Sequence, residues 1–151
     1  MKYYFEIKEN REKLEAILKS WEGTPYRHWS GVKKGGCDCI HFVIKVIEEL
    51  GFGPFKIEKY PCDWHIHNNK ELLLEGINRQ LVIPGIAEKV DVDNPIDGDI
   101  ILYKFGRVLS HSGLYYKGRV YQALDGIGVQ SRRWEDKIWF VRKKHNYRIL
   151  L

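Results

Sequence analysis

The segment of residues 39–50 constrains the fold of this chain more than any other feature. Its apolar residues recur at helical spacing and cover most of the circumference of a helix: Ile40, Phe42, Val43, Ile44, Val46, Ile47 and Leu50. A helix that is apolar on nearly all sides is buried, and Gly51 is a typical C-terminal stop for it. We therefore expect residues 39–50 to be the central helix of the domain.

The rest of the chain separates into a helical part and a part made of strands. Residues 10–21 have the periodicity of an amphipathic helix, and a third helix is expected at residues 69–81. After Pro84 the chain changes to short apolar runs between turns, which are typical of strands: residues 99–105, 111–117, 119–124, 129–132 and 138–142. Helices followed by antiparallel strands indicate an α+β fold. The length of 151 residues fits one domain over residues 1–151.

Composition and charge exclude several classes of protein. The net charge is +5, but the basic residues are scattered and do not alternate with aromatic ones, so we expect no nucleic-acid partner. No apolar run approaches the length of a membrane span, and residues 1–6 lack the apolar core of a secretion signal. Three cysteines, an odd number, favour a fold that does not depend on disulfides. A cytoplasmic protein without a membrane span is the expectation.

Cys39 stands where a glycine-rich loop meets the start of the apolar helix. The first N–H groups of a helix have no intrahelical partner and form the positive end of the helix dipole. A thiol in this position is biased toward thiolate, the form that attacks a carbonyl carbon. Asp38 is a natural N-cap in front of it. Cys37 is a rival nucleophile, but it lies in the loop before the cap, where the dipole is weaker.

A base for this nucleophile is expected among the strands. His111 opens one strand candidate and Gln122 lies on the next, so the two side chains are expected to pair across a hairpin. There the amide orients the imidazole without adding charge, in the order of a Cys–His–polar hydrolase. Gly113, on the same face as His111, leaves room beside the ring for a substrate or a helix end. The alternative is that Cys39, His111 and Gln122 are ordinary interior polar residues.

Two further residues beside the nucleophile are candidates for binding the substrate. Tyr26, in the glycine-rich loop, is either a packed aromatic residue or, if the loop folds over Cys39, a donor to an oxyanion. The backbone N–H of Cys39 is the other expected oxyanion donor. Asp38, apart from capping the helix, is able to face the pocket and hold the ammonium group of a substrate.

Metal binding is a second interpretation of this region. Cysteine and histidine residues form two clusters that together contain enough ligands for a tetrahedral zinc site: Cys37, Cys39 and His41, and Cys62, His65 and His67. The C-x-C spacing and the apolar helix that follows it are atypical of a zinc knuckle. We therefore expect neither a metal nor another cofactor.

Five blocks of the sequence, agreeing in order and spacing, resemble the NlpC/p60 family of papain-like cysteine peptidases, which cut bacterial cell-wall peptides. They lie within residues 21–123: residues 23–27, 37–39, 98–102, 110–115 and 120–123. The Cys-Asp-Cys form, and the segment around Asp63 and Trp64 followed by a leucine-rich helix, look most like the branch found in phage and prophage tail modules.

The resemblance implies a role for each candidate residue. Cys39 becomes the nucleophile and His111 the base, and Gln122 occupies the third polar position, where the family most often has histidine. Tyr26 becomes the pocket tyrosine and Asp38 an anchor for a peptide amine. The implied fold is a central helix packed on an antiparallel sheet. The implied substrate is a peptidoglycan-type peptide, with phage tail proteins as partners and delivery to the cell wall in a phage particle.

Ile40 and His41 depart from the family pattern, in which Ser-Gly usually follows the catalytic cysteine. That serine helps to recognise a free peptide N-terminus, so the specificity of this chain is expected to differ. Two alternatives remain beside a wall peptidase. One is an amidase or acyltransferase that acts on a non-wall substrate with the same fold, and the other is a non-catalytic structural or interaction module of a phage tail.

Overall fold

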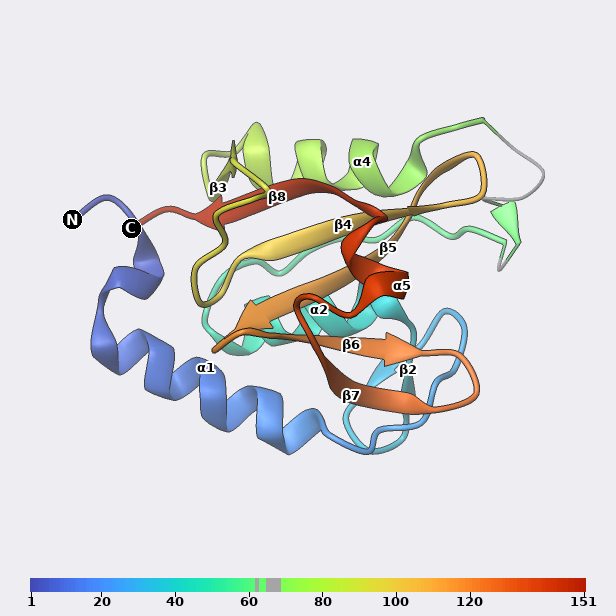
Figure 1. The fold of residues 1–151 in the computed structure, drawn as a ribbon, viewed down its shortest axis with the longest axis horizontal. Coiled ribbons are helices and arrows are strands. Elements are labelled where there is room, and N and C mark those ends of the chain that lie inside the picture. The colour runs from blue at the N-terminus through green and yellow to red at the C-terminus, as the bar shows by residue number, and fades with distance from the viewer. Residues whose placement is uncertain (62, 65–68) are drawn as a thin grey trace.

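The computed structural model describes residues 1–61, 63–64 and 69–151. Within this part of the chain, a six-stranded antiparallel sheet has the strand order β3-β8-β4-β5-β6-β7 (Figure 1). Its strands are Ala87–Val90 (β3), Ile100–Phe105 (β4), Val108–Tyr116 (β5), Arg119–Leu124 (β6), Gly128–Arg133 (β7) and Lys143–Ile149 (β8). Helices pack against this sheet, so the predicted α+β class is confirmed.

The helices lie mostly in the first half of the chain. They are α1 (Lys8–Trp21), α2 (Cys39–Glu49), α4 (Leu72–Ile77) and α5 (Lys137–Phe140), with a 3₁₀ turn η1 (Tyr4–Glu6) and a π-helical turn η2 (Asn78–Val82). A small hairpin of Gly31–Val32 (β1) and Gly36–Cys37 (β2), which was not predicted, leads into α2. The first two predicted helices are confirmed to within two residues at their ends, whereas the third begins at Leu72. No helix in the described ranges is both long and apolar enough to cross a membrane.

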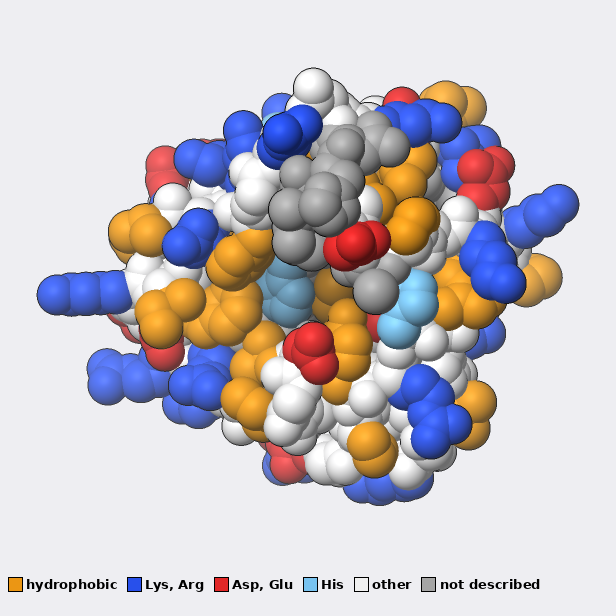
Figure 2. All heavy atoms as spheres, turned by 90° about the vertical axis from the view of Figure 1, so that its right-hand side faces the viewer, with side chains coloured by type: hydrophobic (Ala, Val, Ile, Leu, Met, Phe, Trp, Pro, Cys, Tyr) orange, Lys and Arg blue, Asp and Glu red, His pale blue; other side chains and the backbone are white. Residues whose placement is uncertain are grey.

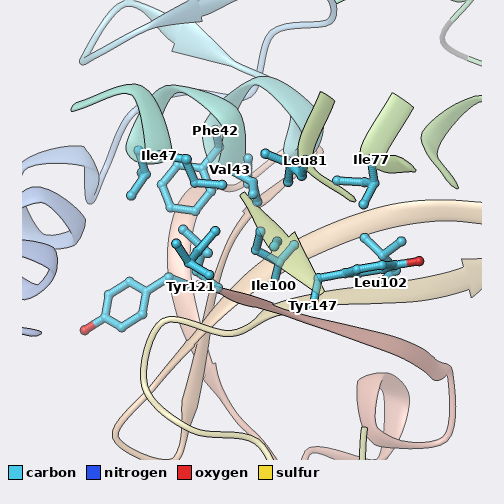
Figure 3. Packing of buried hydrophobic residues seen from close by; sticks show 14 of the residues in the cluster. Phe42, Val43, Ile47, Ile77, Leu81, Ile100, Leu102, Tyr121 and Tyr147 are labelled. Carbon is cyan, nitrogen blue, oxygen red and sulfur yellow. The ribbon is translucent and has the colours of Figure 1, made fainter. Parts of the chain in front are cut away.

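The main apolar core lies between the sheet and the helices α2 and α4. Phe42, Val43 and Ile47 from α2 point toward Ile100 and Tyr147 from the sheet (Figure 3). All of these side chains are at most 2% exposed. The prediction of a central buried helix is therefore confirmed.

The opposite face of the sheet carries a smaller apolar cluster. Successive side chains of β4 alternate between the two faces, so Leu102 joins the main core whereas Ile101 and Tyr103 join the second cluster. Trp139 of α5 packs against this second cluster. The short helix α5 therefore covers the face of the sheet that α2 does not.

Both ends of α2 follow local rules. The Oδ1 atom of Asp38 accepts a hydrogen bond from the backbone N–H of His41 at 2.8 Å, which is the predicted N-cap. At the other end Gly51 has a φ of 104°, a backbone conformation that side-chain-bearing residues rarely adopt. The predicted cap and stop are both present, and together they place Cys39 at the first position of the helix.

The hairpin that joins β5 to β6 is confirmed. Lys117 and Gly118 at its turn have φ values of 47° and 75°, as the turn type that suits a tight hairpin requires. A Cβ atom on Gly113 would come within 2.5 Å of Val120 Cγ1 on β6. The neighbouring strand thus fills the space beside Gly113 that we expected to admit a substrate or a helix end.

The predicted strand at residues 138–142 is wrong. Asp136 accepts a hydrogen bond from the N–H of Ile138 and caps the helical turn α5. Four apolar residues in a row, 138–141, lack the alternation of a half-buried strand.

Two strands, β3 and β8, were not predicted, although β8 lies between β3 and β4 in the sheet. Polar residues interrupt the apolar pattern of β8. Asn146 Nδ2 donates to Asp99 Oδ2 at 2.8 Å, and Arg148 donates to both oxygens of Asp99 at 2.8 and 2.9 Å. Arg148 and the amide nitrogen of Asn146 are compatible with a strand in the interior because the carboxylate of Asp99 accepts their hydrogen bonds. The amide oxygen of Asn146 has no partner among the described residues.

Candidate active site

Cys39 is the first residue of α2, and strand β5 passes beside it. The thiol of Cys39 donates to the carbonyl oxygen of Ser110 at 3.7 Å. The hydroxyl of Ser112 donates to the carbonyl oxygen of Cys39 at 2.9 Å. His111 stands between these two serines in the sequence, so β5 holds the imidazole in a defined position relative to the thiol.

Gln122 of β6 holds the imidazole of His111 from the side. The Nε2 atom of His111 and the Oε1 atom of Gln122 are 2.5 Å apart, so the two side chains meet across the hairpin as predicted. An amide oxygen only accepts hydrogen bonds, so Nε2 carries the proton and Nδ1 is the basic nitrogen. Gln122 is fully buried, and its amide nitrogen has no hydrogen-bond partner among the described residues.

Aromatic side chains enclose the imidazole. The ring centroids of Trp139, Tyr103 and Phe105 lie 5.0, 5.7 and 6.0 Å from that of His111. Burial lowers the pKa of His111 to about 4, because the protonated ring loses its hydration, and the hydrogen bond with Gln122 opposes this only in part. The imidazole is therefore neutral at neutral pH.

The thiol of Cys39 is neutral as well. Burial and, to a smaller extent, the negative charge of Asp38 raise the pKa of Cys39 to about 12, and hydrogen bonding with Ser112 offsets this only in part. The prediction that the helix start biases this thiol toward thiolate is thus wrong. Loss of hydration and a nearby carboxylate outweigh the helix dipole.

The carboxylate of Asp38 is buried next to the thiol and accepts four hydrogen bonds. Oδ1 accepts from the backbone N–H of His41 at 2.8 Å and from its ring Nδ1 at 2.9 Å. Oδ2 accepts from the N–H of Trp29 at 2.8 Å and from the hydroxyl of Tyr60. Burial acts to raise the pKa of Asp38, but the hydrogen bonds with His41 and Tyr60 outweigh it and hold the pKa below its usual value. The carboxylate is therefore ionised and fully engaged within the protein.

The thiol and the imidazole border one cavity of about 290 Å³. Tyr26, from the loop before α2, and Trp139, from α5, line the same cavity. Its remaining walls come from both sides of the cleft: His28, Asp38, Ile40, Tyr60, Trp64, Phe105, Ser110, Ala123, Leu124 and Asp125. Figure 2 looks at the molecule from the right-hand side of Figure 1 and shows hydrophobic side chains gathered around a hollow, with lysine and arginine side chains mostly toward the periphery. A molecule that enters the cavity of about 290 Å³ meets the thiol and the imidazole together.

The structure thus brings four of the predicted site residues, Cys39, His111, Tyr26 and Asp38, to one cavity, and places Gln122 against the imidazole. Cys37 is fully buried outside the cavity wall, and burial raises its pKa to about 12. Neither Cys37 nor Cys39 forms a disulfide in the part of the chain that the structure describes. Of these two cysteines, only Cys39 is placed to meet a substrate.

The alternative zinc site lies partly outside the described residues, because these do not include Cys62, His65 and His67. In the other cluster, the Nδ1 atom of His41 bonds to Asp38. Within the described ranges, no group of three His, Cys, Asp or Glu residues has an arrangement that would hold a metal.

Three residues of the site were missed by sequence reasoning. Tyr60 donates to Asp38, Ser112 donates to Cys39, and Trp139 covers His111. Ser112 carried a detectable signal, since alternation along the strand puts the residue after His111 on the face toward the buried helix. Tyr60 and Trp139 lie in irregular or misassigned segments, so no local pattern pointed to them.

Comparison with known proteins places the fold. No protein-family model matches the chain. A lipoprotein-like member of the NLP/P60 family from Staphylococcus aureus superposes with a TM-score of 0.65 at 15% identity, over 96% of this chain and 43% of that one. An NlpC/P60 family protein from Bacillus cereus superposes with a TM-score of 0.64 at 19% identity, over 93% of this chain and 40% of that one. The NlpC/p60 domain of the peptidoglycan hydrolase SagA superposes with a TM-score of 0.60 at 14% identity, over 90% of this chain and 96% of that domain.

A sequence match adds to this shared fold. The probable endopeptidase NlpC of Escherichia coli (strain K12) is 25% identical to the chain over 135 residues, which cover 81% of this chain and 73% of that protein. Membership of the NlpC/P60 family is supported by these findings. The chain spans less than half the length of the Staphylococcus aureus and Bacillus cereus proteins, so it corresponds to one part of each.

Proposed function

We propose that this chain is a cysteine peptidase or amidase that cleaves an amide bond in short peptides of the bacterial cell wall. The NlpC relative is named as an endopeptidase and SagA as a peptidoglycan hydrolase, which indicates this enzyme class. One observation carries the assignment to residues. Cys39 and His111 line the same cavity, and the Nε2 atom of His111 is bonded to the oxygen of Gln122, which leaves Nδ1 as the proton acceptor.

In the proposed reaction, His111 Nδ1 takes the proton of the Cys39 thiol as the sulfur attacks the substrate carbonyl carbon. The oxyanion of the tetrahedral intermediate is stabilised by the N–H of Cys39, which the helix itself does not use, and by the hydroxyl of Tyr26. His111 then gives its proton to the departing amine as the C–N bond breaks. Water, activated by His111, hydrolyses the acyl-enzyme and restores the thiol.

The two pKa shifts favour proton transfer during the attack over a preformed ion pair. Burial raises the pKa of Cys39 to about 12 and lowers that of His111 to about 4, so both groups are neutral at neutral pH. Gln122 adds no charge to change this. Substrate binding must therefore supply part of the driving force for forming the thiolate.

Neighbouring buried cysteines provide matched variants for a test. Wild type incubated with soluble muropeptides should release shorter peptides, followed by mass spectrometry. Cys39→Ala should lower the rate by about 10⁴-fold or more, because the covalent route is lost. Cys37→Ala, which changes a thiol outside the cavity, should stay within about tenfold of wild type. Cleavage that survives in Cys39→Ala would show that the nucleophile is wrongly assigned.

We further propose, from the resemblance of the Cys-Asp-Cys segment and of the segment around Asp63 and Trp64 with its leucine-rich helix, that the chain acts in a phage or prophage tail and reaches the cell wall with the particle. Mass spectrometry of purified particles from the source strain tests this setting. Detection of the chain at a fixed ratio to tail proteins would support it, and its presence in the cell lysate but not in particles would contradict it.

A further inference from the structure

A second cavity lies beside the one that contains Cys39. It has a volume of about 70 Å³ and is enclosed by α2, α4 and the segment of residues 56–60. Among its walls that are not exposed, Tyr60, Gln80 and Ser112 are the polar ones, and the others are mostly aliphatic: Ile40, Val43, Ile44, Ile57, Leu72, Leu73 and Ile77. The charged residues of this cavity, Lys56, Glu58, Lys59, Glu75 and Arg79, are all exposed and therefore lie toward solvent. The interior thus suits an uncharged aliphatic group.

The two cavities share two wall residues beside the nucleophile. Ile40, the residue after Cys39, lines both of them, and so does Tyr60. Ser112, whose hydroxyl bonds to the carbonyl oxygen of Cys39, also borders the smaller cavity. The residue directly after the reacting cysteine therefore also forms a wall of the apolar recess.

The polar group that could bind a substrate near Cys39, the carboxylate of Asp38, already accepts hydrogen bonds from the protein itself. An ammonium group bound by Asp38 would compete with four donors, from His41, Trp29 and Tyr60, for the two carboxylate oxygens. The hydroxyl of Tyr60 bonds to Asp38, while its side chain forms part of the wall of both cavities. The group that shields the carboxylate thus also shapes the apolar recess.

We propose that the smaller cavity is a substrate subsite for an aliphatic group next to the scissile amide, with Ile40 and Tyr60 at its entrance. This assignment rests on the proposed function, because it takes Cys39 as the reacting residue. About 10–15 Å³ of such space holds one water molecule, so about 70 Å³ accommodates a chain of about four carbons. A branched or linear aliphatic side chain of a peptide has this size, whereas a long lipid acyl chain does not fit.

Gly76 offers a way to fill the subsite without disturbing the fold. It lies on α4 at the cavity wall, and a Cβ atom added to it meets no other atom within 4 Å. Gly76→Leu therefore adds bulk to open space, and it replaces a glycine by a better helix former. Asn78→Leu is the matched control, since Asn78 follows α4 directly, is exposed and does not line the cavity.

Alkylation of Cys39 by substituted iodoacetamides measures the preference directly. The probes are N-butyl, N-(3-aminopropyl), N-methyl and N-octyl iodoacetamide, with each rate read at Cys39 by peptide mass spectrometry and divided by the rate with free cysteine. The first two probes have similar length and differ in a terminal methyl against an ammonium group. His111→Ala is measured alongside as a test of the reacting pair.

In wild type and Asn78→Leu, N-butyl should react at least about tenfold faster than N-(3-aminopropyl) and faster than N-methyl, and N-octyl should be slower than N-butyl. In Gly76→Leu the advantage of N-butyl should fall below about twofold. The subsite would be overturned if N-(3-aminopropyl) or N-octyl iodoacetamide reacted as fast as the N-butyl probe or faster. It would also be overturned if the preference for N-butyl were unchanged in Gly76→Leu. Labelling of Cys39 that does not depend on His111 would instead overturn the proposed function.

Discussion

Two histidines close to Cys39 have contrasting surroundings. His41, on α2, is buried, and its Nδ1 atom lies 2.9 Å from the carboxylate of Asp38. Its ring packs edge-on against Trp29 with the centroids 4.7 Å apart. His111, on β5, has a neutral amide as its partner and three aromatic rings around it. Of the two histidines, His111 alone lines the cavity that holds the thiol.

A carboxylate beside a histidine does not by itself place that histidine at the cavity, because His41 contacts Asp38 but does not line the cavity with Cys39. The bond between His41 and Asp38 belongs to the N-cap of α2, where the same carboxylate also accepts a hydrogen bond from the hydroxyl of Tyr60. At His111 the amide orients the ring and adds no charge, so burial sets its proton affinity. In the proposed function, access to the cavity and a basic nitrogen left free by the amide distinguish His111 from His41.

Replacing each histidine by glutamine is the strongest test of whether His111 and His41 have different roles. His111→Gln should lower muropeptide cleavage by about 10²–10⁴-fold, because the proton acceptor for the thiol is lost. His41→Gln should lower the free energy of unfolding by about 1–3 kcal/mol, since it alters a buried hydrogen bond to a carboxylate. Cleavage by folded His41→Gln should stay within about tenfold of wild type.

Chemical denaturation and initial rates, both measured on the same preparations, separate the two effects. The assignment would be reversed if His41→Gln lost as much activity as His111→Gln while remaining folded at the assay temperature.

The partner of His111 can be tested through its pKa. In wild type, burial holds this pKa at about 4, so the ring signals followed by NMR should titrate near that pH. In Gln122→Glu a carboxylate next to Nε2 favours the protonated ring, and the pKa should rise by about 1–3 pH units. Gln122→Met removes the hydrogen bond that raises the pKa of His111 in wild type, so this variant should lower that pKa.

The same shift predicts how stability depends on pH. A histidine with an ordinary pKa of 6.5 when unfolded and about 4 when folded binds its proton first in the unfolded chain. The free energy of unfolding should therefore fall as the pH drops from about 6.5 to 4, and this loss should be smaller in His111→Gln. Titration of His111 near 6.5 in both wild type and Gln122→Glu would show that the amide and the aromatic rings do not control it.

Local rules account for the features of the site that the sequence predicted. The cap at Asp38 and the nearly all-apolar helix after it depend on residues close together in the chain. The pairing of His111 with Gln122 follows from a short hairpin and from alternation along two adjacent strands. These features need no knowledge of the remaining fold, apart from the existence of a sheet.

Features that depend on distant segments were not predictable in this way. Tyr60 reaches Asp38 across 22 residues from an irregular stretch. Strand β8 contains the buried Asn146 and the half-buried Arg148, which are explained only when Asp99 is seen beside them. The pKa of Cys39 was predicted in the wrong direction because the helix dipole is a local property, whereas burial depends on the whole fold. That residues 1–151 form one domain stays a prediction.

The smallest expected effect concerns Ser112, whose hydrogen bond connects α2, which carries the thiol, to β5, which carries His111. Its hydroxyl donates to the carbonyl oxygen of Cys39 at 2.9 Å and is buried. Ser112→Ala should lower the free energy of unfolding by about 1 kcal/mol. It should also slow His111-dependent alkylation of Cys39 by a few-fold, because α2 loses a tie to the strand that carries the imidazole.

Ser110→Ala is the matched control, because the hydroxyl of Ser110 also donates to a backbone carbonyl, that of Phe105 at 3.0 Å, but makes no bond to α2. This variant keeps the backbone oxygen that receives the thiol of Cys39. A similar loss of stability in both variants, with slower alkylation only in Ser112→Ala, would identify Ser112 as a positioning residue. Equal alkylation rates would mean that the packing of α2 on the sheet is sufficient to hold Cys39 beside His111 without this hydrogen bond.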